Sequence, residues 1–170
     1  MTERSFFNEV YGSWKDKQVE KYEEMVSEIG KWINGCEKAL DIGIGKAWFW
    51  EYLKEKNYDF GFVRGLDVSK KAIEPEKSYI DYVFIDKDEK NLDLEEYIGK
   101  DKYDLILALD SIHLINYSDK LPFFLKKGGF ILQSVPLKFK DCLKKYPDME
   151  IIKEGKAGSK EIDKYILQKK

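Results

Sequence analysis

Nine residues at positions 39–47, Ala-Leu-Asp-Ile-Gly-Ile-Gly-Lys-Ala, constrain the fold of this chain more than any other segment. An apolar run that enters a glycine turn is typical of a parallel strand that opens onto a helix and holds a nucleotide-like ligand. Gly43 and Gly45 carry no Cβ atom, so the backbone there can bend sharply and come close to a ligand. The segment therefore predicts a strand, a ligand-binding turn and a helix over about residues 46–56.

Trp48 limits the kind of ligand that this turn can hold. A dinucleotide-binding turn needs a third small residue at position 48, where this chain has a tryptophan. An indole at that position would occupy the space that a pyrophosphate and close helix packing require. The sequence therefore disfavours a nicotinamide-dependent oxidoreductase.

A second apolar segment, residues 61–67, also ends in an acidic residue. Asp67 follows Gly45 by 22 residues (67 − 45), which fits the offset of about 20 at which a βαβ unit presents a carboxylate to ribose hydroxyls. A carboxylate only accepts hydrogen bonds, so it suits two vicinal hydroxyl donors. The alternative is that Asp67 caps a helix that starts near Ser69. Its spacing from the glycine turn favours the ligand role.

Together the two segments resemble the first motifs of class I S-adenosylmethionine-dependent methyltransferases, in which an acidic residue precedes Gly-x-Gly-x-Gly. Ala47 stands in place of the third glycine. The resemblance continues in order over roughly residues 35–135. It implies S-adenosylmethionine as the cofactor and methyl transfer as the activity.

The resemblance also implies which residues contact the cofactor. Asp41, Gly43 and Gly45 are expected near its methionine part. Asp67, followed by Val68, is expected near its ribose.

Two later segments extend the resemblance toward the adenine and the transferred methyl group. Residues 82–85 form a third predicted strand, and the resemblance implies that Asp88, or alternatively Asp86, receives the adenine amino group. Residues 103–109 form a fourth predicted strand. Leu109 at its end is expected near the methyl group.

His113 and Asp110 are the candidate catalytic residues. His113 is the only histidine of the chain and follows the fourth strand, and an imidazole can accept a proton near neutral pH. Its alternative role is structural, as a hydrogen-bonded histidine at the mouth of the sheet. Asp110 could act as a base or anchor the substrate, or it could cap the turn that follows.

Helix and strand signals alternate along the chain and predict an α/β fold with a mostly parallel seven-stranded sheet and helices on both faces. Apolar residues at helical spacing predict a helix over residues 16–34. We expect a single domain with an N-terminal helical segment over residues 1–34, a cofactor-binding core over 35–135, and a C-terminal helix and antiparallel hairpin over 136–170.

Composition and charge do not indicate a nucleic-acid partner, although they do not exclude one, and they do not indicate a metal site. The formal net charge is −2, so no broad basic field favours nucleic acid. Cys36 and Cys142 lack the spacing of metal ligands, so neither a metal site nor a disulfide framework is indicated. The absence of a signal peptide and of a membrane-length apolar run predicts a soluble, cytoplasmic protein.

Two functions fit these observations. The first is methyl transfer from S-adenosylmethionine to an acceptor that no motif identifies. The second is a catalytically degenerate S-adenosylmethionine-binding domain that acts as a partner or regulatory module. Ala47 and Lys127, at positions where the family has glycine and commonly proline, motivate the second.

Overall fold

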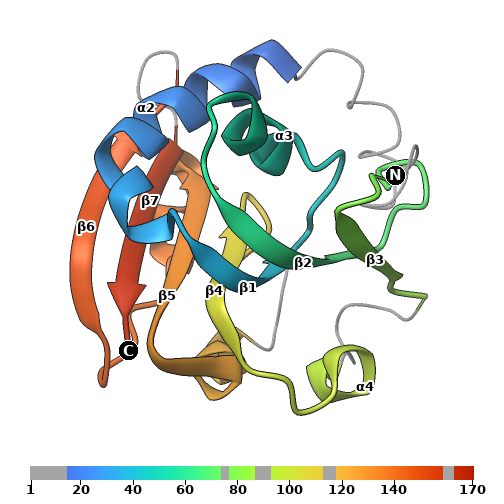
Figure 1. The fold of residues 1–170 in the computed structure, drawn as a ribbon. Coiled ribbons are helices and arrows are strands. Elements are labelled where there is room, and N and C mark those ends of the chain that lie inside the picture. Colours follow the sequence, from blue (N-terminus) through green and yellow to red (C-terminus); the bar gives the residue numbers. More distant parts are fainter. Residues whose placement is uncertain (1–14, 74–76, 87–92, 113–117, 159–162) are drawn as a thin grey trace.

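The computed structural model describes residues 15–73, 77–86, 93–112, 118–158 and 163–170. They contain a seven-stranded sheet with the strand order β3-β2-β1-β4-β5-β7-β6 (Figure 1). Strands β1 to β5 are parallel, whereas β7 is antiparallel to β5 and β6 is antiparallel to β7. This confirms the predicted fold class. The strands are β1 Cys36–Ile42, β2 Phe60–Asp67, β3 Ile80–Phe84, β4 Tyr103–Leu109, β5 Leu125–Pro136, β6 Glu150–Ala157 and β7 Asp163–Lys169.

Helices cover both faces of the sheet. Helices α2 (Lys15–Ile33) and α3 (Trp48–Glu55) pack against each other and share one hydrophobic cluster with the sheet (Figure 1). Helix α4 (Leu94–Ile98) and the 3₁₀ helix η3 (Ser118–Phe124) contribute to a second cluster on the other face. Buried side chains of α2 recur at helical spacing, as the sequence predicts: Tyr22, Met25, Val26, Ile29 and Ile33.

Several element boundaries differ from the sequence-based expectation. Helix α3 is shorter than the predicted 46–56, because Ala47 takes a left-handed conformation and α-helical geometry ends before Lys56. The predicted turn into the fifth strand is already part of β5, which pairs with β4 from Leu125 onward through a register shift. The expected C-terminal helix is only a 3₁₀ segment, η4 (Leu137–Cys142).

The order of the strands indicates which edge of the sheet is the candidate ligand site. The chain runs from β1 outward to β2 and β3, and then returns to β4 on the other side of β1. Connections on the two sides of β1 therefore diverge between the carboxyl ends of β1 and β4, where open α/β sheets bind their ligands. We call this side of the sheet the carboxyl edge and the opposite side the amino edge. Within the described ranges, no helix has the length and apolar character needed to cross a membrane.

Candidate functional site

The glycine turn at the carboxyl edge has three residues in the left-handed region. Their φ angles are 76° for Gly43, 55° for Gly45 and 56° for Ala47. A side chain in this conformation costs roughly 1–2 kcal/mol, yet Ala47 adopts it. The third position of the motif thus has a backbone conformation that glycine favours, although its residue is alanine.

The packing of the protein itself requires a glycine at position 43. A Cβ atom on Gly43 would lie 2.6 Å from Cβ of Ser111, a distance that side chains do not tolerate. The Ser111 hydroxyl in turn donates a hydrogen bond to the carbonyl oxygen of Ile42. The segment after β4 therefore packs directly on the turn after β1.

Asp41, the acidic residue of the motif, is buried with 4% of its surface exposed. Its Oδ2 accepts a hydrogen bond of 2.7 Å from Nε1 of Trp50 in α3. Burial raises the pKa of Asp41 to about 7, an effect that the Trp50 hydrogen bond opposes and the nearby Asp67 charge reinforces. The sequence does not identify Trp50 as the partner of Asp41, because nothing in it shows which of three consecutive aromatic residues faces the strand.

Asp67 ties the second strand to the glycine turn. Its Oδ2 accepts a 2.8 Å hydrogen bond from the Gly45 amide, and its Oδ1 accepts one of 2.8 Å from the Ser69 amide. Burial raises the pKa of Asp67, while the amides of Ser69, Gly45 and Val68 oppose the rise. Asp67 thus stabilises the local turn at Ser69 and also contacts the glycine turn through the Gly45 amide. Each carboxylate oxygen has a further acceptor site.

Asp110 lies at the end of β4 with a φ of 57°. Its Oδ1 accepts a 2.9 Å hydrogen bond from the Ser134 hydroxyl, and its Oδ2 forms an ion pair with Lys21 of α2. Burial alone would raise the pKa of Asp110, but Lys21, together with hydrogen bonds from Ser134 and Gln18, outweighs burial and lowers the pKa. A carboxylate with a lowered pKa is a weak base, so the contacts favour an anchoring role over proton abstraction.

Lys21 is a site residue that sequence analysis missed. Only 2% of it is exposed, and its ammonium also lies 3.1 Å from Oδ2 of Asp163 at the start of β7. A signal was present, since Lys21 precedes Met25 by one helical turn and so belongs to the apolar stripe of α2. A lysine in such a stripe needs a buried anionic partner.

The remaining residues that the sequence predicts for the site lie farther along the carboxyl edge or outside the described residues. Val68 and Leu109 are half-buried and pack on opposite hydrophobic clusters. Asp86 is exposed and accepts a 3.0 Å hydrogen bond from the Tyr97 hydroxyl. Asp88 and His113 lie outside the described residues.

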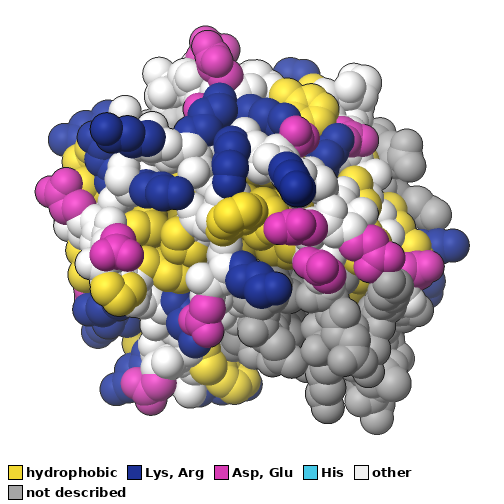
Figure 2. Space-filling model, turned by 90° about the horizontal axis from the view of Figure 1, so that it is seen from below, with side chains coloured by type: hydrophobic (Ala, Val, Ile, Leu, Met, Phe, Trp, Pro, Cys, Tyr) yellow, Lys and Arg dark blue, Asp and Glu magenta, His cyan; other side chains and the backbone are white. Residues whose placement is uncertain are grey.

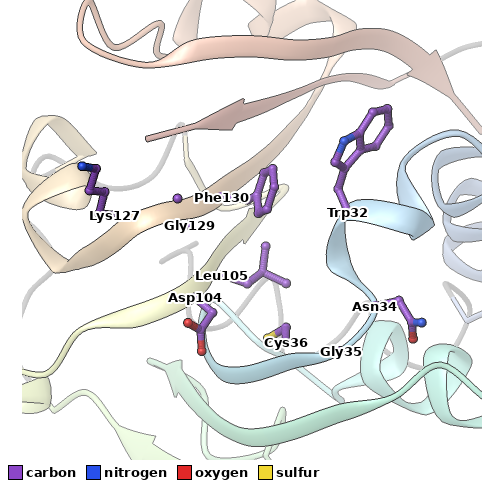
Figure 3. Close-up of a pocket in the computed structure, with 10 residues that line it drawn as sticks. Trp32, Asn34, Gly35, Cys36, Asp104, Leu105, Lys127, Gly129 and Phe130 are labelled. Carbon is purple, nitrogen blue, oxygen red and sulfur yellow. The ribbon is translucent and has the colours of Figure 1, made fainter.

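A cleft of about 200 Å³ lies at the amino edge, away from all of these residues. Leu105 and Phe130 from neighbouring strands line it together with Trp32 from the end of α2 (Figure 3). Figure 2 views the molecule from below the orientation of Figure 1. On this side, where the amino ends of β4 and β5 lie, hydrophobic side chains are grouped among lysines.

In the amino-edge cleft, Asp104 is paired within the protein and Cys36 is kept protonated. Asp104 accepts hydrogen bonds from the Lys38 amide at 2.8 Å and from the Lys126 ammonium. Burial and the charge of Asp104 raise the pKa of the Cys36 thiol to about 12, so this thiol stays protonated. The candidate site is therefore the carboxyl edge.

Comparisons with known proteins bear on the fold of the chain. No protein-family model matches the sequence, and no curated protein matches it either. A chain from a complex that contains the Haloferax volcanii Trm112 methyltransferase activator matches with a TM-score of 0.72 at 9% identity, over 99% of this chain and 98% of that chain.

Two enzymes match nearly as well. The plantazolicin methyltransferase BpumL, solved with S-adenosylhomocysteine (SAH) and a plantazolicin analogue, has a TM-score of 0.62 at 16% identity over 99% of this chain and 89% of its own. The 16S rRNA methylase ArmA has a TM-score of 0.60 at 14% identity over 99% and 91%. The protein therefore has the fold of class I S-adenosylmethionine-dependent methyltransferases.

Proposed function

We propose that this protein transfers a methyl group from S-adenosylmethionine to an acceptor. The observation that carries the proposal is the 2.8 Å hydrogen bond from the Gly45 amide to Asp67. It joins the two sequence motifs at the point where the strand order reverses, which is where this fold class binds nucleotide-like ligands.

The proposed binding mode follows the strands along the carboxyl edge. The methionine part of the cofactor lies against Asp41, Gly43 and Gly45. The ribose hydroxyls donate hydrogen bonds to the acceptor sites of Asp67 that the Gly45 and Ser69 amides leave open.

The rest of the cofactor extends toward β3 and β4. Val68 packs beside the adenosine, and Asp86 or Asp88 accepts a hydrogen bond from the adenine amino group. Leu109, the last residue of β4, lies near the sulfonium and helps to exclude water from it.

The chemistry needs little from the protein beyond placement. The sulfonium of the bound cofactor supplies the reactive methyl carbon, and the chain holds the acceptor in line with it. His113 accepts a proton where the attacking atom carries one. Asp110, held by Lys21 and Ser134, anchors the acceptor by hydrogen bonding and remains ionised throughout.

The structure weakens the case for a degenerate cofactor-binding module. That alternative depended partly on Ala47 replacing a glycine, and Ala47 takes a left-handed conformation that glycine favours. The fold itself leaves the acceptor class open, because its structural matches include both an rRNA methylase and a plantazolicin methyltransferase. A search for the acceptor therefore begins with RNA and with low-molecular-weight compounds.

Calorimetric titration with S-adenosylmethionine tests the proposal. Asp67→Ala should weaken binding by about 1.5–3 kcal/mol, roughly tenfold or more, because charge-assisted hydrogen bonds to the ribose are lost. Asp148→Ala, at an exposed aspartate in the connection before β6, is the matched control and should bind as the wild type does. A folded Asp67→Ala variant with unchanged affinity would contradict the binding mode, and a wild type that does not bind would contradict the function.

A further inference from the structure

Three charged side chains from distant parts of the chain meet at the carboxyl edge. Lys21 comes from α2, Asp110 follows β4, and Asp163 begins β7. The side chain of Lys21 is 3% exposed, and those of the two aspartates are 21% and 8% exposed. Charges this deeply buried are costly unless they are paired, so each carboxylate depends on the one ammonium.

The contacts of Asp110 fix both its backbone and its side chain. Its amide donates a 2.9 Å hydrogen bond to the carbonyl oxygen of Ser134, whose hydroxyl donates to Oδ1. Lys21 holds Oδ2, and Gln18 lies 3.5 Å from the same oxygen. A non-glycine residue keeps a left-handed conformation only where its surroundings determine it in this way.

Asp110 is connected to the glycine turn through the next residue. Ser111 donates a hydrogen bond to the Ile42 carbonyl, and its Cβ atom occupies the space beside Gly43 where a side chain would otherwise point. The position of the segment after β4 therefore sets the position of the turn after β1. A series of direct contacts leads from Lys21 through Asp110 and Ser111 to Gly43.

We propose that Lys21 is a positioning residue for cofactor binding: its buried ammonium holds Asp110 and Asp163 together and so keeps the segment after β4 seated on the glycine turn. This rests on the proposed function, because it takes the glycine turn to be where the cofactor binds. Lys21 itself does not touch the cofactor.

Removing the ammonium should make cofactor binding sensitive to pH. Among the described residues, Asp110, Asp163 and Tyr22 are the titratable groups that face Lys21, and Asp41 lies within electrostatic range of Tyr22. In Lys21→Met the two aspartates face each other without a cation, so burial and mutual repulsion favour protonation of one of them. That proton relieves the repulsion at low pH and is lost at high pH.

The test is calorimetric titration of the full chain with SAH at pH 6 and pH 8. Lys21→Met should bind about 3- to 30-fold more weakly than the wild type at pH 8, the range expected for a residue coupled to a site that it does not touch. The ratio should be smaller at pH 6. Lys17→Met, on the exposed part of α2 one turn earlier, is the matched control and should show wild-type affinity at both pH values.

A second variant covers the case in which Lys21→Met does not fold. Ser134→Ala keeps the ion pairs and removes one hydrogen bond to Asp110, so it should weaken SAH binding in the same direction by a smaller factor. Wild-type affinity in folded Lys21→Met at both pH values would overturn the inference. So would a pH-independent loss, or wild-type affinity in Ser134→Ala where Lys21→Met is unfolded. If the wild type itself fails to bind SAH, the proposed function is overturned. If the wild type binds and only the predicted effects of the variants are missing, the inference about Lys21 alone is overturned.

Discussion

The indole Nε1 of Trp50 donates a hydrogen bond of 2.7 Å to Oδ2 of Asp41, nine residues earlier in the chain. Trp50 is fully buried, and Asp41 is 4% exposed. The first helix after the glycine turn therefore reaches back to the acidic residue that precedes the turn. This contact orients the Asp41 carboxyl group and gives its buried Oδ2 a hydrogen-bond donor, without which burial of that oxygen would cost free energy.

Trp50→Phe should destabilise the protein because it leaves the Asp41 oxygen without its donor. The expected loss is about 1–3 kcal/mol in the free energy of unfolding, plus the cost of a smaller ring. Urea denaturation measures it. Trp32→Phe, at a half-buried tryptophan of the amino edge, is the control and should cost clearly less. Equal losses in the two variants would show that the hydrogen bond to Asp41 contributes nothing.

The raised pKa of Asp41 predicts how stability depends on pH. The folded protein holds this proton up to a pKa of about 7, whereas the unfolded chain releases it near the ordinary value of 3.8. The unfolded state binds fewer protons between these values, so Asp41 makes the protein less stable as the pH rises from about 4 to about 7.

Asp41→Asn removes this effect and retains an oxygen that accepts from Trp50. The stability of the variant relative to the wild type should therefore rise between pH 4 and pH 7, by at most about 4 kcal/mol. Denaturation curves at several pH values provide the measurement. A constant difference between the two proteins would show that Asp41 has an ordinary pKa.

Gly43→Ala should be more damaging than Gly35→Ala, although the two glycines have nearly equal φ angles of 76° and 77°. A Cβ atom on Gly35 meets nothing within 4 Å, so that variant reports the backbone strain alone, about 1–2 kcal/mol. Gly43→Ala adds the collision with Ser111 and should cost a further 1–3 kcal/mol or so. Unfolding free energies measured under the same conditions test the difference. Similar values would show that the segment after β4 does not press on the turn.

His113→Asn tests the proposed proton acceptor. Methyl transfer to an acceptor with a titratable proton should fall by about 10²–10⁴-fold, while the affinity for SAH stays nearly unchanged. Single-turnover assays and calorimetry separate the two quantities. Full turnover combined with a lower melting temperature would assign His113 a structural role and leave methyl transfer intact, since transfer can proceed by proximity alone.

The parts of the fold that sequence predicts well depend on local pattern. The glycine turn, the carboxylate at Asp67 and the terminal hairpin are each encoded within a few consecutive residues. The mostly parallel sheet with a terminal antiparallel hairpin is predicted from the alternation of helices and strands together with the family resemblance. Strand β4 is found at its predicted bounds, because the apolar run at residues 105–109 follows Tyr103 and ends before Asp110.

The parts that sequence does not predict depend on contacts between distant residues. Lys21 and Asp110 are 89 residues apart, and no local pattern indicates that they meet. The start of α3 at Trp48 depends on the left-handed backbone conformation of Ala47, which the sequence does not show. The structure brings Asp41, Gly43, Gly45 and Asp67 together at the carboxyl edge. Their contacts with the cofactor remain predictions.

The most direct test of a cofactor site at the carboxyl edge is NMR titration of the ¹⁵N-labelled protein with SAH. The backbone amide signals of Gly43, Gly45 and Asp67 should shift on binding, while those of Gly128 and Gly129 at the amino-edge cleft should stay in place. Shifts confined to the amino edge, or no shifts at saturating SAH, would contradict the account.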